Sequence, residues 1–495
     1  MSSRPNIVFI FSDQQRYDTL ACYGNDWIQT PNLNALADSS FVFERAYVTQ
    51  PVCTPARSSI VTGLYPHTAR MTVNKMNLPP DKKSIAEMIS EDYHTGWFGK
   101  WHLGDDVIRQ HGFDEWVSTE DGHRPEYTKR EYRGTMSDYH NHMVEHGFEP
   151  DTTAADGTPM FSARKRASLP EEHQMASFLG GKAADFIDRN SDNPFMLYVS
   201  TFEPHPPYYG PLNDLYDPEE LPVGPTFLKV PEGASMHNTV RARYCTQYLG
   251  QPDADVDPYL LSNAASGNDV TTEAGWRKLR ARYFANITLV DRMVGTIIEA
   301  LERNGVADNT VIVFTSEHGE MGGDHGMLEK RSMYEESARV PLLMRVPWLS
   351  QEKTMLQGAA GHIDLVPTLL DLSGNDVPGH LQGKSLAPVL RGEQTLDGNE
   401  VYVQWNGVSD IDDRHLGSAE INLRNTQPWR TLVRDGWKLA LCATDQCELY
   451  DLENDPYEEH NLFEDPAQKD RVRNMAAHIR LWQHKNGDHA PLPTV

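Results

Sequence analysis

Short runs of β-branched and aromatic residues alternate along this chain with longer segments in which apolar residues recur at helical spacing. A continuous apolar run followed by a helix is typical of a strand buried on both faces of a parallel sheet. The alternation therefore predicts an α/β fold in which helices sandwich a large, mostly parallel sheet. Strands are expected at residues 7–11, 94–98, 195–199 and 311–314, and helices after Pro31, around residues 85–89, at 178–187 and at 290–301.

The pattern changes near residue 395, and 495 residues exceed the usual size of one domain, about 150 residues. We expect a main α/β domain over residues 1–395. Two stretches within it, about 118–166 and 210–268, lack periodicity and are expected to be irregular insertions that shape a substrate entrance. Residues 396–495 are expected to form a small α+β subdomain. Its predicted elements are strands at 401–405, 431–433, 437–442 and 448–451 and a helix at 468–484.

Acidic residues outnumber basic ones by 71 to 45, which gives a net charge of −26. A field of that sign repels nucleic acid and anionic membranes, so neither is an expected partner, and an anionic substrate must be held by local cations. The first apolar run, residues 7–11, is too short to cross a bilayer, and no secretory signal is readable. Five cysteines in so long a chain do not make a disulfide framework, so a cytoplasmic location is expected.

Polar clusters follow the predicted strands. Ligands collect beyond the carboxyl ends of strands in an open α/β sheet, so these side chains are expected to come together. The clusters are Asp13-Gln14, Lys100-Trp101-His102, Glu203-Pro204-His205 and Glu317-His318.

A fifth cluster, Cys53-Thr54-Pro55-Ala56-Arg57, is the most specific motif. Pro55 suits the first turn of a helix, so Cys53 is expected at a helix N-terminus, where backbone N–H groups and the dipole favour an anion. Arg57, one turn further, adds a fixed positive charge. Taken alone, this pentapeptide is more simply explained as a buried structural cysteine beside a helix that starts at a proline. The surrounding sequence decides between this interpretation and a functional anion site.

The stretch from Cys53 to His67, CTPARSSIVTGLYPH, closely resembles the signature of the type I sulfatases of the alkaline phosphatase superfamily. In that family a maturation enzyme oxidises the motif cysteine to formylglycine. The resemblance runs in family order over most of the chain and implies a sulfuric ester hydrolase of the arylsulfatase type. It includes Asn6-Ile7-Val8, Gly99-Lys100-Trp101-His102-Leu103-Gly104, Glu317-His318-Gly319-Glu320 and Glu448-Leu449-Tyr450-Asp451-Leu452.

The resemblance also implies a reaction, the hydrolysis of a small-molecule or sugar sulfate ester. A hydrated formylglycine carries two hydroxyls on one carbon, and a divalent metal ion lowers the pKa of one so that it attacks sulfur. The resemblance places Arg57 and Lys100 beside the formylglycine. Together with Lys330, they would bind the oxygens of the sulfuryl group. His205 or Lys330 would protonate the departing oxygen, and His102 would deprotonate the second hydroxyl so that sulfate is expelled.

The implied metal shell departs from the commonest sulfatase pattern. It consists of Asp13, Gln14, Glu317, His318 and an oxygen of the modified Cys53. Gln14 stands where the family has a second aspartate, and Glu317-His318 stands where it has an Asp-Asn or Asp-His pair, so the site loses one carboxylate. A histidine nitrogen suits Mn²⁺ better than Ca²⁺, so Mn²⁺ becomes an alternative. Asn74 falls where the family often has a sulfate-contacting asparagine, with Asn77 as a rival position.

Two other functions remain open. Phosphonate monoester hydrolases, which use the same formylglycine, share features of this metal shell, so hydrolysis of phosphonate monoesters or phosphodiesters is the alternative activity. A non-catalytic anion-binding protein, in which Cys53 is never oxidised, is the alternative from another class. The substrate itself and any assembly into a homo-oligomer are not readable from the sequence.

Overall fold

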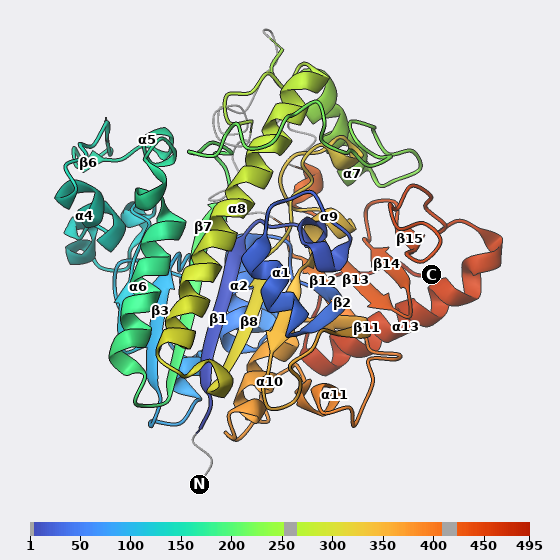
Figure 1. The fold of residues 1–495 in the computed structure, drawn as a ribbon. Coiled ribbons are helices and arrows are strands. Elements are labelled where there is room, and N and C mark those ends of the chain that lie inside the picture. Colours follow the sequence, from blue (N-terminus) through green and yellow to red (C-terminus); the bar gives the residue numbers. More distant parts are fainter. Residues whose placement is uncertain (1–3, 252–264, 408–422) are drawn as a thin grey trace.

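A large mixed sheet forms the centre of the molecule in the computed structural model, which describes residues 4–251, 265–407 and 423–495 (Figure 1). Its strands are β1 (Asn6–Asp13), β2 (Phe41–Tyr47), β3 (His94–Gly99), β4 (Glu115–Val117), β7 (Phe195–Pro204), β8 (Thr310–Ser316), β9 (Arg339–Val340), β10 (Leu342–Arg345) and β11 (Thr354–Gly361). The order is β11-β2-β10-β8-β1-β7-β3-β4, with β9 paired to β2. Only β9 and β10 run antiparallel to their neighbours among these nine strands, so the predicted mostly parallel sheet is confirmed.

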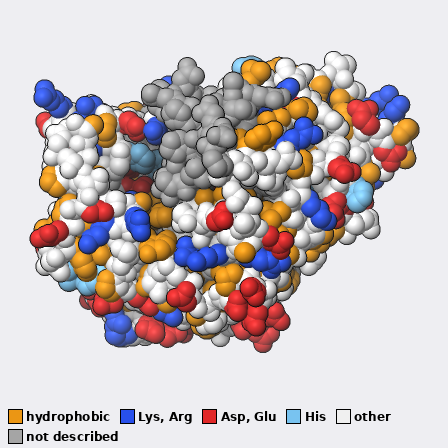
Figure 2. Space-filling view, turned by 90° about the horizontal axis from the view of Figure 1, so that it is seen from above, with side chains coloured by type: hydrophobic (Ala, Val, Ile, Leu, Met, Phe, Trp, Pro, Cys, Tyr) orange, Lys and Arg blue, Asp and Glu red, His pale blue; other side chains and the backbone are white. Residues whose placement is uncertain are grey.

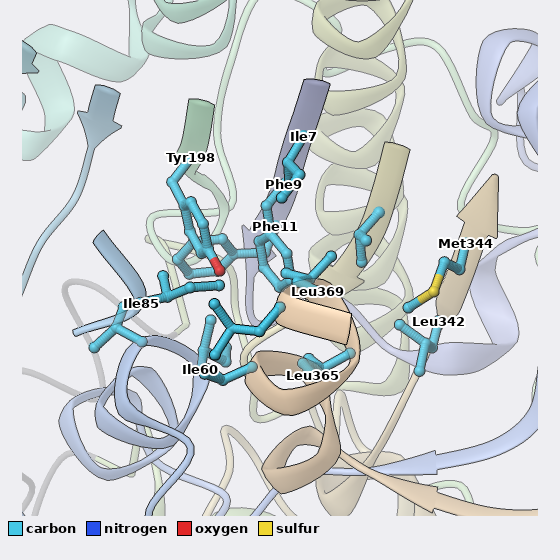
Figure 3. Packing of buried hydrophobic residues seen from close by; sticks show 14 of the residues in the cluster. Ile7, Phe9, Phe11, Ile60, Ile85, Tyr198, Leu342, Met344, Leu365 and Leu369 are labelled. Carbon is cyan, nitrogen blue, oxygen red and sulfur yellow. The ribbon is translucent and has the colours of Figure 1, made fainter. Parts of the chain in front are cut away.

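Both faces of this sheet are buried under helices. Along β1, Ile7, Phe9 and Phe11 point to one face, and Val8 and Ile10 point to the other, as the period of two in a strand requires. Helices α2 and α10 cover the first face (Figure 3), and α1, α6 and α8 cover the second. All five side chains are fully buried, and each contributes about 1.5–3 kcal/mol by leaving water.

Helices connect most of these strands and also form part of the insertions. Those in the described part of the chain are α1 (Pro31–Asp38), α2 (Cys53–Thr62), α3 (Pro66–Ala69), α4 (Asp138–Glu145), α5 (Ala163–Ala167), α6 (Met175–Asn190), α7 (Met236–Arg243), α8 (Glu273–Arg303), α9 (Glu335–Ala338), α10 (Leu365–Leu372), α11 (Ala387–Leu390) and α13 (Lys469–Asn486). None of them is long and apolar enough to cross a bilayer.

Some local expectations need correction. The helix expected around residues 85–89 is only one 3₁₀ turn, η3 (Ile85–Glu87), although Ile85 and Ile89 are both buried. Its start is stabilised by a capping box from Ser84, but the chain turns towards β3 before a second turn of helix can form.

The two expected insertions contain short regular elements. The stretch 118–166 contains α4, the start of α5 and the two-stranded sheet of β5 (Thr152–Thr153) and β6 (Pro159–Met160). The stretch 210–268 contains α7, and its residues 252–264 lie outside the described part.

The C-terminal sheet is antiparallel, as expected, and lies beside the β11 edge of the large sheet (Figure 1). Its strands are β12 (Val401–Trp405), β13 (Trp429–Arg434), β14 (Trp437–Leu441) and β15 (Glu448–Asp451). Leu432 and Leu439 face helix α13, while Val433 and Ala440 face the main domain. The position of the domain boundary at residue 395 stays a prediction.

A buried lysine joins the C-terminal sheet to the main domain. Lys438 of β14 lies 2.8 Å from Glu335 of α9 and 2.7 Å from Glu458, and it donates a hydrogen bond to the carbonyl oxygen of Met333. Its side chain is 2% exposed, so the carboxylates have no access to water as a substitute partner. Removing one member of such a buried group leaves an uncompensated charge.

We therefore expect Lys438→Ala to lower the free energy of unfolding by about 3–5 kcal/mol, measured by equilibrium urea denaturation. Lys353→Ala is the matched control, because Lys353 makes only an exposed ion pair with Asp38, and it should cost less than about 1 kcal/mol. Equal stabilities of the two variants would show that Lys438 does not hold the C-terminal sheet in place.

Candidate active site

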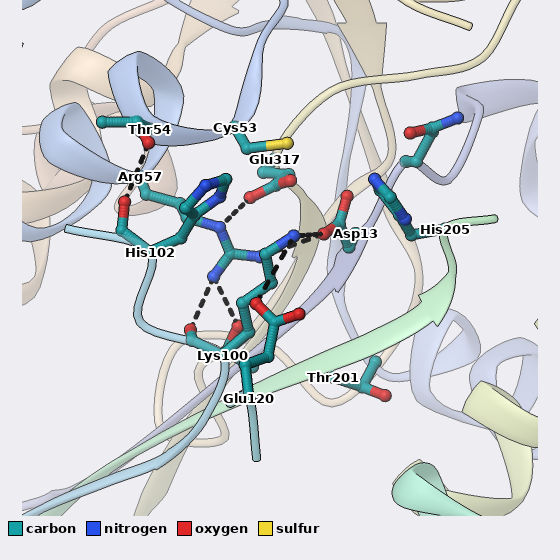
Figure 4. Close-up of polar contacts among 12 residues, drawn as sticks. Asp13, Cys53, Thr54, Arg57, Lys100, His102, Glu120, Thr201, His205 and Glu317 are labelled. Atoms are coloured by element: carbon teal, nitrogen blue, oxygen red, sulfur yellow. Dashed lines mark hydrogen bonds and ion pairs between the residues drawn. The ribbon is translucent and has the colours of Figure 1, made fainter. Parts of the chain in front are cut away.

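The polar clusters that were expected to meet lie together at the carboxyl ends of four neighbouring strands (Figure 4). Asp13 ends β1, Lys100 follows β3, His205 follows β7 and Glu317 follows β8. Helix α2 adds Cys53 and Arg57 from its first turns. Apart from the partly exposed His205, all of these side chains are buried, so charges interact strongly here. Figure 2 shows acidic and basic side chains interspersed on the surface seen from this end.

Cys53 is the first residue of α2, as the motif predicted. Val52 before it is extended, and the free backbone N–H of Thr54 in the first turn donates to Oδ1 of Asn74 at 3.0 Å. Asn74 is thus held beside Cys53, whereas its rival Asn77 is exposed. The Thr54 hydroxyl donates to the carbonyl oxygen of His102 at 2.8 Å, which fixes the helix start against the segment after β3.

The Cys53 side chain is 2% exposed and points towards the carboxylates (Figure 4). Burial, together with the nearby Glu317 carboxylate, raises the pKa of its thiol above the usual range. The unmodified cysteine is therefore a neutral thiol at neutral pH and a poor nucleophile. Any nucleophilic role for this position needs a change in its chemistry.

Cys53 and three side chains beside it suit a metal ion. Asp13, Cys53, Glu317 and His318 each offer one ligand atom, and these atoms lie within 4.8 Å of one another. Oδ1 of Asp13 and Oε1 of Glu317 are buried without a hydrogen-bond donor among the described residues. His318 Nδ1 donates to the carbonyl oxygen of Gly319 at 3.0 Å, which leaves Nε2 for a ligand bond. Carboxylate oxygens with one imidazole fit Mn²⁺ well and Ca²⁺ less well.

Gln14 lies next to this cluster, and its amide is held on both sides. Its Oε1 accepts a hydrogen bond from Lys330 Nζ at 2.6 Å, and its Nε2 donates to the Tyr208 hydroxyl at 2.8 Å and to Glu320. Tyr208 in turn donates to Glu320 at 2.5 Å. Neither Tyr208 nor Glu320 was assigned a role from the sequence, although Glu320 belongs to the motif after β8 and Tyr208 closely follows His205.

Two buried cations balance the carboxylates. Arg57 forms an ion pair with Glu317 and donates to the Lys100 carbonyl oxygen and the Ser200 hydroxyl, both at 2.7 Å. Lys100 Nζ lies 2.6 Å from Asp13 Oδ2. Burial alone would raise the pKa of Asp13, but the charge of Lys100, with a smaller contribution from Arg57, holds it well below its usual range. Asp13 is therefore an anion across the physiological pH range.

Glycine is required directly before Lys100. Gly99 has φ +111°, and a Cβ there would lie 1.9 Å from the carbonyl oxygen of Ser200. That close approach lets the Lys100 N–H donate to the same oxygen at 3.0 Å. The glycine in the family motif thus places the lysine backbone against β7.

His102 stacks on a second histidine that was not identified from the sequence. The rings of His102 and His123 are 4.5 Å apart and nearly parallel, and His123 Nδ1 lies 3.0 Å from Asp106 Oδ2. The other oxygen of Asp106 accepts from the His102 backbone N–H at 2.8 Å. Burial, then the charges of His123 and Lys100, lower the pKa of His102 well below its usual range, so its ring is neutral at neutral pH.

His205 and Lys330 contact each other at the entrance to the site. His205 Nδ1 donates to the carbonyl oxygen of Pro206 at 2.9 Å, so its Nε2 carries the lone pair and accepts from Lys330 Nζ at 3.3 Å. Burial, with help from Lys330 and Lys100, lowers the pKa of His205. Burial acts to lower the pKa of Lys330 too, but the negative charges of Glu329 and Asp13 raise it above its ordinary value. At neutral pH the proton of this pair is on Lys330.

Several site residues have left-handed backbone, which costs a non-glycine residue roughly 1–2 kcal/mol. Gln14 has φ 73° and His102 has φ 56°. The residues on either side of Lys330 also have left-handed backbone, with φ 64° at Glu329 and φ 77° at Arg331. Strain is thus concentrated where the side chains converge.

Sulfatases are among the known proteins with a similar sequence. The chain matches the family model described as Sulfatase over residues 5–375 and the model described as N-sulphoglucosamine sulphohydrolase, C-terminal, over residues 323–485. N-acetylglucosamine-6-O-sulfatase of Bacteroides thetaiotaomicron is 26% identical, with 93% of this chain and 83% of the relative covered.

Several solved structures share the fold, including the following two. One, described as bound to its substrate D-glucosamine-2-N,6-O-disulfate, has a TM-score of 0.76 at 23% identity and covers 99% of both chains. The other, a phosphonate monoester hydrolase from Silicibacter pomeroyi, has a TM-score of 0.76 at 25% identity and covers 98% of this chain and 96% of its own.

The carboxylate oxygens without donors generate a prediction about metal binding. Metal-depleted protein should bind one equivalent of Mn²⁺ at this site, and Asp13→Asn should weaken binding by more than about 100-fold, because even partners outside the coordination shell are worth 10–100-fold. Equilibrium dialysis with metal analysis measures this. Asp114→Asn, at the opposite end of the sheet, is the control, and equal Mn²⁺ affinity in both variants would remove Asp13 from the metal shell.

Proposed function

The chain belongs to the sulfatase family of sulfuric ester hydrolases, and on that premise we propose that it hydrolyses sulfate monoesters of sugars through a formylglycine made from Cys53. The observation that carries this proposal is the position of Cys53. It begins α2 beside the Asp13, Glu317 and His318 cluster, with Arg57 and Lys100 adjacent. Every side-chain type that sulfuryl transfer requires is present around this one residue.

The groups that the family adds would complete this site. When present, a formylglycine at position 53 would supply paired hydroxyls on one carbon, and a divalent ion held by Asp13, Glu317 and His318 would supply Lewis acidity. All remaining functions belong to side chains of the chain itself.

Arg57 and Lys100 supply fixed positive charge. Both are buried and hydrogen-bonded to backbone or neighbouring side chains, so they need no reorganisation when negative charge moves onto sulfuryl oxygens. Because they act on the sulfuryl group and the nucleophile, their contribution does not depend on the leaving group.

Lys330 is the best candidate for proton donation to the leaving oxygen. It carries its proton at neutral pH, and Gln14 and His205 orient its ammonium group by accepting from it. His205 is neutral and holds the donor in place. His102 is also neutral, and its Nδ1 is buried without a partner among the described residues, which suits a base.

A sugar is the substrate class that the surroundings favour. A pocket next to His205 is lined by aromatic and polar side chains, among them Tyr139, Arg166, Phe202 and Tyr209. Such a mixture suits a ring with an apolar face and several hydroxyls. The relative named N-acetylglucosamine-6-O-sulfatase supports the same class.

Phosphonate monoester hydrolysis is the second candidate. It is favoured by the structural similarity to the phosphonate monoester hydrolase and by Gln14 in the predicted metal shell. Both reactions use an anionic, tetrahedral group held by cations, so the same side chains serve either.

We expect purified, metal-loaded protein to cleave sulfate monoesters with a higher kcat/KM than phosphonate monoesters in a parallel assay. Cys53→Ala and Cys53→Ser should both lose at least roughly 10³-fold in turnover, because neither can supply two hydroxyls on one carbon. Mass spectrometry of the peptide containing Cys53 provides the independent readout, since a carbonyl oxygen should replace sulfur.

Full multiple turnover by either Cys53 variant would overturn the mechanism. An intact thiol in protein from its native host would favour the anion-binding alternative. A faster reaction with phosphonate monoesters than with sulfate monoesters would make phosphonate hydrolysis the main activity.

A second prediction separates the proton donor from the fixed cations. Lys330→Ala should lose roughly 10²–10⁴-fold in kcat/KM on alkyl or sugar sulfates and far less on an activated nitrophenyl sulfate, because a stable phenolate needs no proton. Lys100→Ala is the comparison variant and should slow all esters by a similar factor. Measuring kcat/KM over esters of graded leaving-group pKa, with His205→Ala alongside, tests the assignment. Uniform losses in both the Lys330 and His205 variants would show that neither group takes part in protonation.

A further inference from the structure

Three histidines meet where helix α4 of the 118–166 insertion contacts η6 (Glu171–His173), the turn that leads into α6. His142 lies on α4, His146 is the residue that caps its C-terminal end, and His173 ends η6. His142 and His146 are four residues apart and so share one helix face. One ring nitrogen from each of the three lies within 4.8 Å of the others.

The nitrogen spacing of two of these histidines, His142 and His173, is that of ligands on one ion. His142 Nε2 lies 3.2 Å from His173 Nδ1. Two imidazole nitrogens bound to a tetrahedral Zn²⁺ at 2.0–2.1 Å lie about 3.3 Å apart. The third ring is close to both, with centroid distances of 4.1 Å from His146 to His142 and 4.7 Å from His146 to His173.

The hydrogen bonding of His146 fits a ligand role. Its Nδ1 donates to the carbonyl oxygen of His142 at 2.8 Å, so Nε2 carries the lone pair. A carbonyl acceptor on the second ring nitrogen is the usual arrangement for a metal-bound histidine.

Contacts with neighbouring residues hold these histidines in place. The Tyr139 hydroxyl of α4 donates to the carbonyl oxygen of His173 at 2.8 Å. The rings of Phe178 and Phe148 pack against His142 and His173, at 4.9 and 5.1 Å. Figure 1 shows α4 at the edge of the molecule, next to α6. The three rings are therefore positioned before any ion binds.

We propose that His142, His146 and His173 bind one divalent transition-metal ion, with Zn²⁺ as the natural candidate and solvent at the fourth position. Imidazole nitrogens select Zn²⁺, Cu²⁺, Ni²⁺ or Co²⁺ over Ca²⁺ and Mg²⁺, which prefer oxygen ligands. The ion joins the 118–166 insertion to the start of α6. Tyr139 on α4 and Met175 at the start of α6 both line the pocket next to His205, so this ion fixes two walls of that pocket relative to each other.

Co²⁺ titration of metal-depleted, full-length protein tests the proposal, because tetrahedral Co²⁺ has visible absorption. The wild type should bind one more equivalent than His146→Ala, and Asp13→Asn should retain the absorption of the histidine site. His460→Ala is the matched control, since the side chain of His460 is 79% exposed and lies far along the chain from the cluster. Equal Co²⁺ stoichiometry in His146→Ala and the wild type would overturn the proposal.

Thermal unfolding gives a second readout. Added Zn²⁺ should raise the Tm of the wild type and of His460→Ala more than that of His146→Ala or His173→Gln, because an ion that binds only the native state stabilises it. His146 is exposed, so metal-free His146→Ala should unfold at the wild-type temperature, which separates loss of the ion from loss of the fold. The same Zn²⁺-induced rise in all four proteins would also overturn the proposal.

Discussion

Asp13 is completely buried, and its negative charge has to be balanced inside the protein. Lys100 provides this balance directly, and Arg57 provides it for the adjacent Glu317. Their positions depend on four elements of the main domain, since Asp13 ends β1, Lys100 follows β3, Glu317 follows β8 and Arg57 lies on α2. A buried carboxylate that lacked either cation would become protonated, and the cluster around Cys53 would lose its ability to hold a cation.

Much of the fold was predictable because its signals are local. The runs at residues 7–11 and 311–314 are apolar at every position, as is typical of a strand that is covered on both faces. In the structure, β1 and β8 are such strands. The 85–89 segment misled because Ile85 and Ile89 are buried without a regular helix between them. Two buried apolar residues four positions apart occur in a short turn as well as in a helix. The spacing of apolar residues therefore does not determine the length of the helix.

For the active site, the sequence predicted which side chains meet but not what they contact. The motifs predicted that Asp13, Cys53 and His318 lie close together, and in the structure their ligand atoms lie within 4.8 Å of one another. The contacts of Tyr208 with Gln14, and of His123 with His102, were not predicted, because they join segments with no fixed spacing along the chain. The metal-binding role of the first group stays a prediction.

The left-handed backbone at Gln14 and His102 limits how this protein can be stabilised. Replacing a left-handed residue by glycine usually relieves strain and is a common route to higher thermal stability. At these two positions the same change would remove an amide that orients Lys330 or a ring that faces the nucleophile position. Selection for heat resistance therefore has to act elsewhere in the chain, and laboratory evolution of more stable variants should leave both residues unchanged.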